Sequence, residues 1–272
     1  MSVKLIYSSP VWLIANGIRY SHDNHHLSDS FIINYTLDCP KCGSDNNNFY
    51  GNSLICEDCG FNLTEHIGSK DFNLIKKVGF KMKHESVLEH SLIVFEFEAS
   101  RALLQELSRS RIGVSPTVKS TRYVLKKDLK NETSFISDKL IKNWLIVNGI
   151  DGTKKWFDID KAKKYIFLTG DDDIDACSIQ ALENVRFMIS RNKSNDVTKY
   201  AIPESMLFKG QYSMNLRALV HLLELRTNKD VLPEFQQLCK DIIDVLPDNY
   251  RELVLTNEKI RTNYERIKNE NC

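Results

Sequence analysis

Hydrophobic and polar residues alternate in blocks along this chain of 272 residues, and the blocks predict both strands and helices. Two runs rich in β-branched and aromatic residues, 3–7 and 91–98, predict strands, the second of them mostly buried. Apolar residues recur at helical spacing in 10–20, 72–83 and 100–111. We therefore expect the strand at 91–98 to lead directly into the helix at 100–111.

The second half of the chain is mainly helical by the same criterion. Helical periodicity covers 137–147, 175–190, 213–226 and 232–245. Pro247 closes the last of these helices, because proline cannot continue a helix. The segment 124–178 as a whole is charged and poorly patterned, so we expect it to be peripheral. We also expect the charged tail, 256–272, to be frayed.

Two Cys-x-x-Cys pairs lie in a small segment at 31–64. The first pair is Cys39 with Cys42 and the second is Cys56 with Cys59. A glycine follows each pair and permits the positive φ that such turns use. Four thiolates in a tetrahedral arrangement suit zinc, so the spacing predicts a zinc ribbon.

Four sulfur ligands leave no open position for water, which favours a structural metal over a catalytic one. A ribbon that reads nucleic acid is one alternative, although the segment lacks a basic cluster, and iron in a rubredoxin-like site is another. The remaining cysteines, Cys177, Cys239 and Cys272, stand alone. This usage fits a metal site in a reducing compartment better than a disulfide framework.

The composition excludes several broad classes of protein. With 42% hydrophobic residues, the chain can bury the sizeable core of a globular enzyme. Its 37 basic and 36 acidic side chains give a net charge of +1, so no global field attracts nucleic acid or an anionic membrane. Any phosphate binding must be local. No apolar run of about 18 residues is present, so we expect a cytoplasmic protein without a membrane partner.

A dense array of basic and hydroxyl side chains begins at the end of the helix expected at 100–111 and continues beyond it. Arg109 and Arg111 stand one residue apart, and the run Lys119-Ser120-Thr121-Arg122 follows across a loop. Planar guanidinium groups suit phosphate and carboxylate ligands. A solvated helix end is the alternative interpretation of an isolated Arg-x-Arg pair, and the other parts of the pattern weigh against it.

Further polar residues occur in a fixed order along the chain. His90 follows Glu89 directly before the strand at 91–98, and Lys199 stands four positions before Pro203. The helix expected at 213–226 carries Asn215, Arg217, His221 and Arg226. Taken in order, Glu-His, Arg-x-Arg, Ser-x-Arg-Tyr, Asn-x-Arg and Leu-Arg resemble the pattern of the flavin-dependent thymidylate synthases.

The resemblance implies an α+β fold with a core of helices packed on a mixed or antiparallel sheet. That core would be formed by 1–30 and 65–255, with the ribbon as an insertion at 31–64. The resemblance also implies an enzyme that converts dUMP to dTMP with FAD, NADPH and methylenetetrahydrofolate. Members of this family are homotetramers with active sites between subunits, and the same assembly is implied here.

By the same resemblance, Arg226 would hold and polarise the uracil ring, and Arg109 would share the catalytic site. The residues expected to bind dUMP are Glu106, Arg109, Lys119, Ser120, Thr121, Arg122, Lys199 and Arg226. The residues expected to bind the flavin are Ser21, His90, Arg109, Arg111, Asn215, Arg217 and His221. No cysteine nucleophile is needed in this family.

The chain departs from the family pattern at several positions on the flavin side. Ser110 replaces the middle histidine of Arg-His-Arg, the loop between Gly113 and Ser115 is longer by one residue, and Asp230 and His221 replace the expected histidine and asparagine. These changes leave two alternatives open. One is a flavin-dependent enzyme that installs a hydroxymethyl group on dUMP or dCMP, and the other is a non-catalytic homologue that binds nucleotides or nucleic acid.

Overall fold

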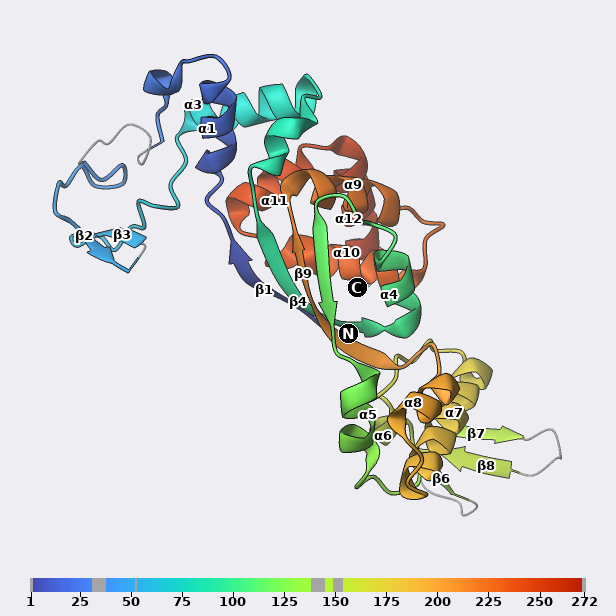
Figure 1. The fold of residues 1–272 in the computed structure, drawn as a ribbon. Helices are drawn as coiled ribbons and strands as arrows, with labels where there is room; N and C mark the ends of the chain where they lie inside the picture. Colours follow the sequence, from blue (N-terminus) through green and yellow to red (C-terminus); the bar gives the residue numbers. More distant parts are fainter. Residues whose placement is uncertain (1, 31–37, 52, 138–144, 149–153, 271–272) are drawn as a thin grey trace. The chain divides into compact units, whose positions relative to one another are not determined.

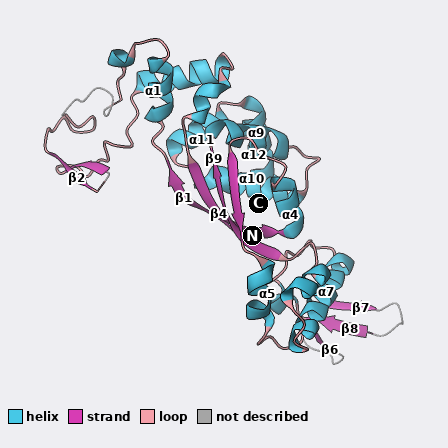
Figure 2. Ribbon diagram, in the orientation of Figure 1, coloured by secondary structure: helices cyan, strands magenta, loops and turns pink. Residues whose placement is uncertain are grey.

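The computed structural model describes residues 2–30, 38–51, 53–137, 145–148 and 154–270 (Figure 1). The chain divides into two compact units. The first unit contains residues 1–2, 96–109 and 116–211, and the second contains 3–95, 110–115 and 212–272. Helices and strands are both abundant (Figure 2), which confirms the α+β class.

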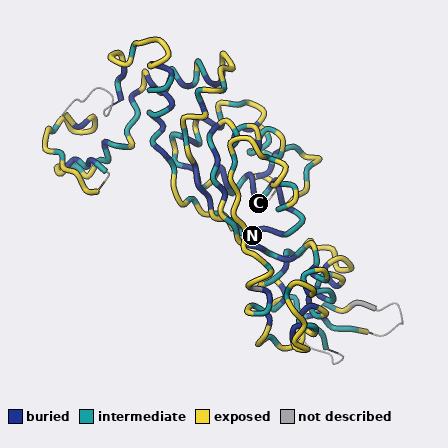
Figure 3. The backbone as a smooth tube through the Cα atoms, viewed as in Figure 1, coloured by how far each residue is buried: buried dark blue, intermediate teal, exposed yellow. Residues whose placement is uncertain are grey.

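Four strands form a sheet in the order β1-β4-β9-β5. Their bounds are Ser2–Ser8 for β1, Ile93–Ser100 for β4, Leu207–Met214 for β9 and Val114–Val118 for β5. The strands predicted at 3–7 and 91–98 are therefore confirmed. β4 is buried at nearly every position (Figure 3), as its apolar run predicts. Pro116 is tolerated in β5 because that strand lies at an edge of the sheet.

Short helices form the N-terminal part of the second unit. They are α1 (Trp12–Tyr20), η1 (His25–Leu27), α3 (Ser69–Ile75), the π-helical turn η2 (Lys76–Lys81) and η3 (Glu85–Glu89). The helices predicted at 10–20 and 72–83 are confirmed, although the second begins earlier and changes to π-helical geometry at Lys76.

The C-terminal part of the second unit is helical. It contains α9 (Leu216–Arg226), α10 (Pro233–Val245), α11 (Asp248–Leu255) and α12 (Glu258–Glu270). The expectation of a frayed tail is wrong for the described residues. Ile260 and Ile267 lie on one face of α12, both buried, because the helix packs against α9, α10 and α11.

The first unit has its own core. Its helices are α4 (Arg101–Leu107), α5 (Thr121–Leu129), α6 (Ile159–Ala162), α7 (Asp172–Ser190), α8 (Asn195–Thr198) and the 3-10 turn η4 (Lys199–Ala201). A small antiparallel sheet accompanies them, in the order β6 (Ile136–Ser137), β8 (Lys154–Phe157) and β7 (Leu145–Asn148).

Two expectations for the first unit are corrected. The segment 124–178 is not peripheral to this unit, because Leu129, Phe135 and Phe157 are buried in its core. The helix predicted at 137–147 is wrong where it can be checked, since Ser137 ends β6 and residues from Leu145 onward form β7. Residues 138–144 lie outside the described part of the chain. The apolar spacing of 145–148 is also compatible with a strand, and pairing with β8 decides in favour of β7.

A buried polar cluster ties both ends of the ribbon segment to α1. Arg19 donates from Nε to Asp71 Oδ1 at 2.6 Å, and Ser30 Oγ donates to Asp71 Oδ2 at 2.6 Å. Ser28 also donates its hydroxyl to Asp71 Oδ2, and Ser30 accepts a bond from the Gly68 amide at 3.2 Å. Since Ser28 and Ser30 precede the ribbon and Asp71 follows it, the cluster closes the base of the insertion.

We predict that Asp71→Ala lowers the free energy of unfolding by about 3–5 kcal/mol, because it leaves the buried Arg19 guanidinium without its partner. Urea denaturation followed by circular dichroism measures the change. Asp45→Ala, which removes an exposed carboxylate from the ribbon, is the control and should unfold like the unmodified protein. Equal stability of the two variants would contradict the prediction.

Candidate functional site

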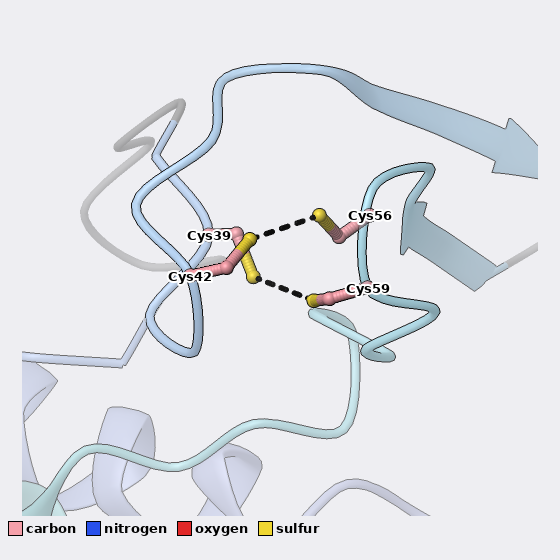
Figure 4. Close-up of side chains that lie close together, drawn as sticks. All are labelled: Cys39, Cys42, Cys56 and Cys59. Atoms are coloured by element: carbon pink, nitrogen blue, oxygen red, sulfur yellow. Dashed lines mark hydrogen bonds between the residues drawn. The ribbon is translucent and has the colours of Figure 1, made fainter.

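The four ribbon cysteines converge on one point. β2 (Asn47–Tyr50) and β3 (Ser53–Cys56) pair as an antiparallel hairpin, and the cysteine turns lie beside it. Figure 4 shows the thiols pointing toward one another, with all four sulfur atoms within 4.8 Å. Cys39 Sγ lies 3.7 Å from Cys59 Sγ, and Cys42 Sγ lies 3.5 Å from Cys56 Sγ.

These separations fit tetrahedral zinc, whose Zn–S bonds of about 2.3 Å place sulfur atoms about 3.8 Å apart. Gly43 and Gly60 close the two turns at φ 77° and 69°, as expected from the sequence. Burial of Cys39 opposes ionisation, but backbone hydrogen bonds from Lys41 and Cys42 and the neighbouring sulfurs lower the pKa of its thiol to about 7. The pKa values of Cys42 and Cys59 are instead raised, by hydrogen bonds to neighbouring thiols and by burial, and a coordinated divalent ion would favour their thiolate forms.

A cavity of about 490 Å³ lies within the first unit. Three of the residues expected to bind dUMP line it: Lys119, Thr121 and Lys199. β5 ends at Val118, the Lys119 amide donates to the Lys209 carbonyl at 2.9 Å, and α5 begins two residues later at Thr121. Lys199 reaches the same cavity because it begins η4, directly after α8.

The other residues expected to bind dUMP in this unit do not line the cavity. Arg109 pairs with Glu106 at 3.2 Å, and Arg122 Nε lies 3.3 Å from Asp196 Oδ1. Ser120 is the N-cap residue of α5 and makes no side-chain cap hydrogen bond. The structure thus gathers part of the predicted set and leaves the rest on the surface of the same unit.

Ion pairs also involve the cavity residues. Lys119 Nζ lies 2.6 Å from Asp128 Oδ2, and both side chains are partly exposed. Pairs this exposed contribute little to stability, because water screens them, so a ligand phosphate can compete for the ammonium group. Lys199 Nζ lies 5.6 Å from the ring centroid of Tyr200, and no described carboxylate pairs with it.

A second cavity, of about 240 Å³, lies within the second unit at the N-terminus of α9. Asn215, Arg217 and His221, all expected to bind the flavin, line it. Asn215 caps the helix, since its Oδ1 accepts a hydrogen bond from the Ala218 amide at 2.9 Å. Arg217 Nη1 donates to Glu89 Oε1 at 2.6 Å, and its Nε lies 3.6 Å from Glu85 Oε2.

The remaining residues expected at the flavin and uracil lie outside the lining of this cavity. His90 packs against α1, where a side chain on Gly17 would collide with the imidazole at 2.5 Å. Ser21 follows α1 and donates to the Ile18 carbonyl at 2.7 Å. Arg111 is exposed, and Arg226 ends α9 with its guanidinium carbon 5.0 Å from the ring centroid of Phe235.

Several residues that line the two cavities were not predicted from the sequence. They are Arg101, Tyr200 and Glu204 in the first cavity, and Glu85, Glu89, Ile112 and Ala218 in the second. Glu89 could have been found, because it directly precedes His90 in the Glu-His pair. Nothing in the local pattern distinguishes the others from ordinary surface residues.

Several known proteins are similar to this chain in sequence. The family model described as thymidylate synthase complementing protein matches residues 46–249. A flavin-dependent thymidylate synthase of Campylobacter jejuni is 37% identical over 195 residues, covering 71% of this chain and 81% of that protein. One from Wolinella succinogenes is 38% identical over 200 residues, covering 73% of this chain and 88% of that protein.

A solved structure agrees with the sequence comparisons. The thymidylate synthase X of Helicobacter pylori, crystallised with FAD and dUMP, superposes with a TM-score of 0.72 at 30% identity. The match covers 96% of this chain and 99% of that one. The chain belongs to the family of flavin-dependent thymidylate synthases.

Every helix in the described part of the chain is too short or too polar to span a bilayer.

We predict that the purified protein contains about one zinc ion per chain, held by the four cysteines. The double variant Cys39→Ser, Cys42→Ser should lose the metal and unfold at a lower temperature, because metal binding supplies folding free energy to so small a segment. Elemental analysis and thermal denaturation measure both effects. Cys177→Ser, at an exposed cysteine outside the cluster, is the control and should retain the zinc.

Proposed function

We propose that the chain catalyses the reductive methylation of dUMP to dTMP, with FAD as cofactor, methylenetetrahydrofolate as one-carbon donor and NADPH as reductant. The observation that carries the proposal is the convergence on one cavity of Lys119, Thr121 and Lys199, three residues that the resemblance assigns to dUMP. The names of its relatives and the FAD and dUMP bound in the Helicobacter pylori structure support it.

The charge of the first cavity suits a nucleotide. Its lining has three cations, Arg101, Lys119 and Lys199, against one carboxylate, Glu204, so the balance is 3 − 1 = +2. Asp128, which pairs with Lys119, lowers this surplus to +1, and the remaining positive charge attracts a phosphate monoester, which carries up to two negative charges near neutral pH. A volume of about 490 Å³ also lies in the range of small-ligand sites.

The second cavity fits part of an FAD molecule. Arg217 and the N-terminus of α9 offer positive charge to a phosphate, and Asn215 fixes that helix end. Ile112 lines the same cavity with 87% of its surface exposed, which suits contact with a flat ring. These residues would hold the cofactor, which when bound supplies the redox chemistry of the reaction.

The protein's own groups bind and polarise the substrate. We assign Lys119 and Lys199 to the dUMP phosphate and Thr121 to a hydrogen bond with the nucleotide. Arg226 would polarise a uracil carbonyl, because a fixed guanidinium stabilises charge that develops on oxygen. Arg109 and Glu106 would complete the nucleotide site, and Arg111 and His90 the flavin site.

The remaining assignments extend the same proposal. We assign the ribbon, 31–64, as a structural zinc insertion in a catalytic domain formed by 1–30 and 65–255. The enzyme would act in the cytoplasm as a homotetramer with active sites between subunits. Size-exclusion chromatography with light scattering tests the assembly.

Two measurements on purified protein test the reaction. A flavin absorption band after reconstitution with FAD would separate an enzyme from a non-catalytic homologue. Incubation with NADPH, methylenetetrahydrofolate and either dUMP or dCMP, followed by mass spectrometry, should give a product only from dUMP, in which a methyl group has replaced one hydrogen. A hydroxymethylated product, or none, would overturn the proposal.

We expect Lys199→Ala to raise KM for dUMP by roughly 10–100-fold, the size of one charge-assisted hydrogen bond to phosphate. Steady-state kinetics at saturating cofactor concentrations measure the change. Lys193→Ala, at an exposed lysine of the same unit, is the control and should leave KM unchanged. If dUMP binds both variants equally well, Lys199 does not contact the phosphate.

Arg226→Ala should lower kcat by about 100-fold or more, because it removes the group assigned to polarise the uracil ring. Circular dichroism should show an intact fold. Arg261→Ala, at an exposed arginine of α12, is the matched control and should turn over normally. Retained activity in Arg226→Ala would remove this residue from the site.

A further inference from the structure

The second cavity contains an unusual balance of charge for a site that receives phosphates. The N-terminus of α9 and the guanidinium of Arg217 attract anions. Two carboxylates from η3, Glu85 and Glu89, line the same cavity. Among the Arg, Lys, Asp and Glu side chains of the lining, one is positive and two are negative, so the balance is 1 − 2 = −1.

Both carboxylates contact the one arginine. Glu89 Oε1 accepts a hydrogen bond from Arg217 Nη1 at 2.6 Å, and Glu85 Oε2 lies 3.6 Å from Arg217 Nε. The two glutamates stand four residues apart and reach Arg217 from the same short helical turn. Each of the three side chains is 45% exposed, so the pairs are in contact with water and can be exchanged for another anion.

We propose that Glu85 and Glu89 form an acidic latch on Arg217 that limits the affinity of this cavity for the pyrophosphate of the flavin cofactor. The inference rests on the proposed function, because it takes that pyrophosphate to be the anion that meets Arg217. A phosphate must displace Glu89 from Nη1, and both carboxylates repel it at short range. The latch keeps Arg217 ordered in the absence of cofactor and makes cofactor binding reversible.

Glu89→Gln tests the latch, because glutamine keeps an acceptor oxygen and nearly the same shape while it removes the negative charge. FAD binding to the full chain, stripped of cofactor, is followed by quenching of flavin fluorescence. We expect the Kd for FAD to fall by about 3–10-fold, the effect of removing one unit charge a few ångströms from a phosphate in a partly hydrated site. The difference should shrink at high ionic strength, where the Debye length is only about 3 Å.

Two controls isolate the charge effect. Riboflavin, which has no phosphate, should bind the variant and the unmodified protein equally. Glu65→Gln makes the same charge change at an exposed residue of the same unit and should leave FAD binding unchanged. Glu85→Gln provides a second variant of the latch, with a smaller effect in the same direction because its contact is longer.

The outcomes are distinguishable. Equal or weaker FAD binding by Glu89→Gln and Glu85→Gln, with dUMP turnover intact, overturns the latch alone. A gain for riboflavin as large as the gain for FAD also overturns it, since the pyrophosphate would then not be the group repelled. If none of the proteins binds FAD, the proposed function and the latch fall together.

Discussion

The carboxylate of Asp71 has no exposed surface, so both of its oxygens must find partners within the protein. Arg19 from α1 and the hydroxyls of Ser28 and Ser30 provide them. Because Ser28 and Ser30 precede the ribbon segment and Asp71 follows it, the cluster joins the two ends of the insertion at one place. The buried carboxylate of Asp71 therefore fixes where the ribbon segment joins α1.

Helix α1, which supplies Arg19, also contacts His90, one of the residues expected to bind the flavin. Gly17 lies two residues before Arg19, and its missing side chain leaves room for the His90 imidazole. Trp12, one turn earlier, donates from its indole to the Thr64 carbonyl at 2.6 Å, at the end of the ribbon. A ribbon held to α1 at both places can stabilise this region, which agrees with the structural zinc site proposed for its four sulfur donors.

Periodicity predicted most of the elements, because the buried faces of β4, α7 and α10 are built from residues close in the sequence. Periodicity failed where contacts between residues distant in the sequence determine the secondary structure. The helix predicted at 213–226 begins at Leu216, since Ser213 and Met214 continue β9 and Asn215 provides the cap. The tail expected to be frayed is helical because Ile260 and Ile267 find partners on other helices.

The candidate sites likewise combine residues that the sequence pattern named with residues that it did not. Of the residues that the family pattern named, Lys119, Thr121 and Lys199 line one cavity and Asn215, Arg217 and His221 line the other. The family pattern did not identify the acidic partners. Arg217 meets Glu89 across 128 residues of sequence, and such pairing depends on how α9 and η3 pack rather than on either segment alone.

Paired cations recur among the residues proposed to bind anions. Lys119 with Asp128, Arg122 with Asp196 and Arg217 with Glu89 all form ion pairs at partly exposed positions. Pairing orders a long side chain before the ligand arrives, and water screening keeps the pair weak enough to be exchanged. Lys199 differs, since its ammonium group faces the ring of Tyr200 and no described carboxylate competes for it. Among the cations proposed for the nucleotide, Lys199 can therefore receive a phosphate without first giving up a partner charge.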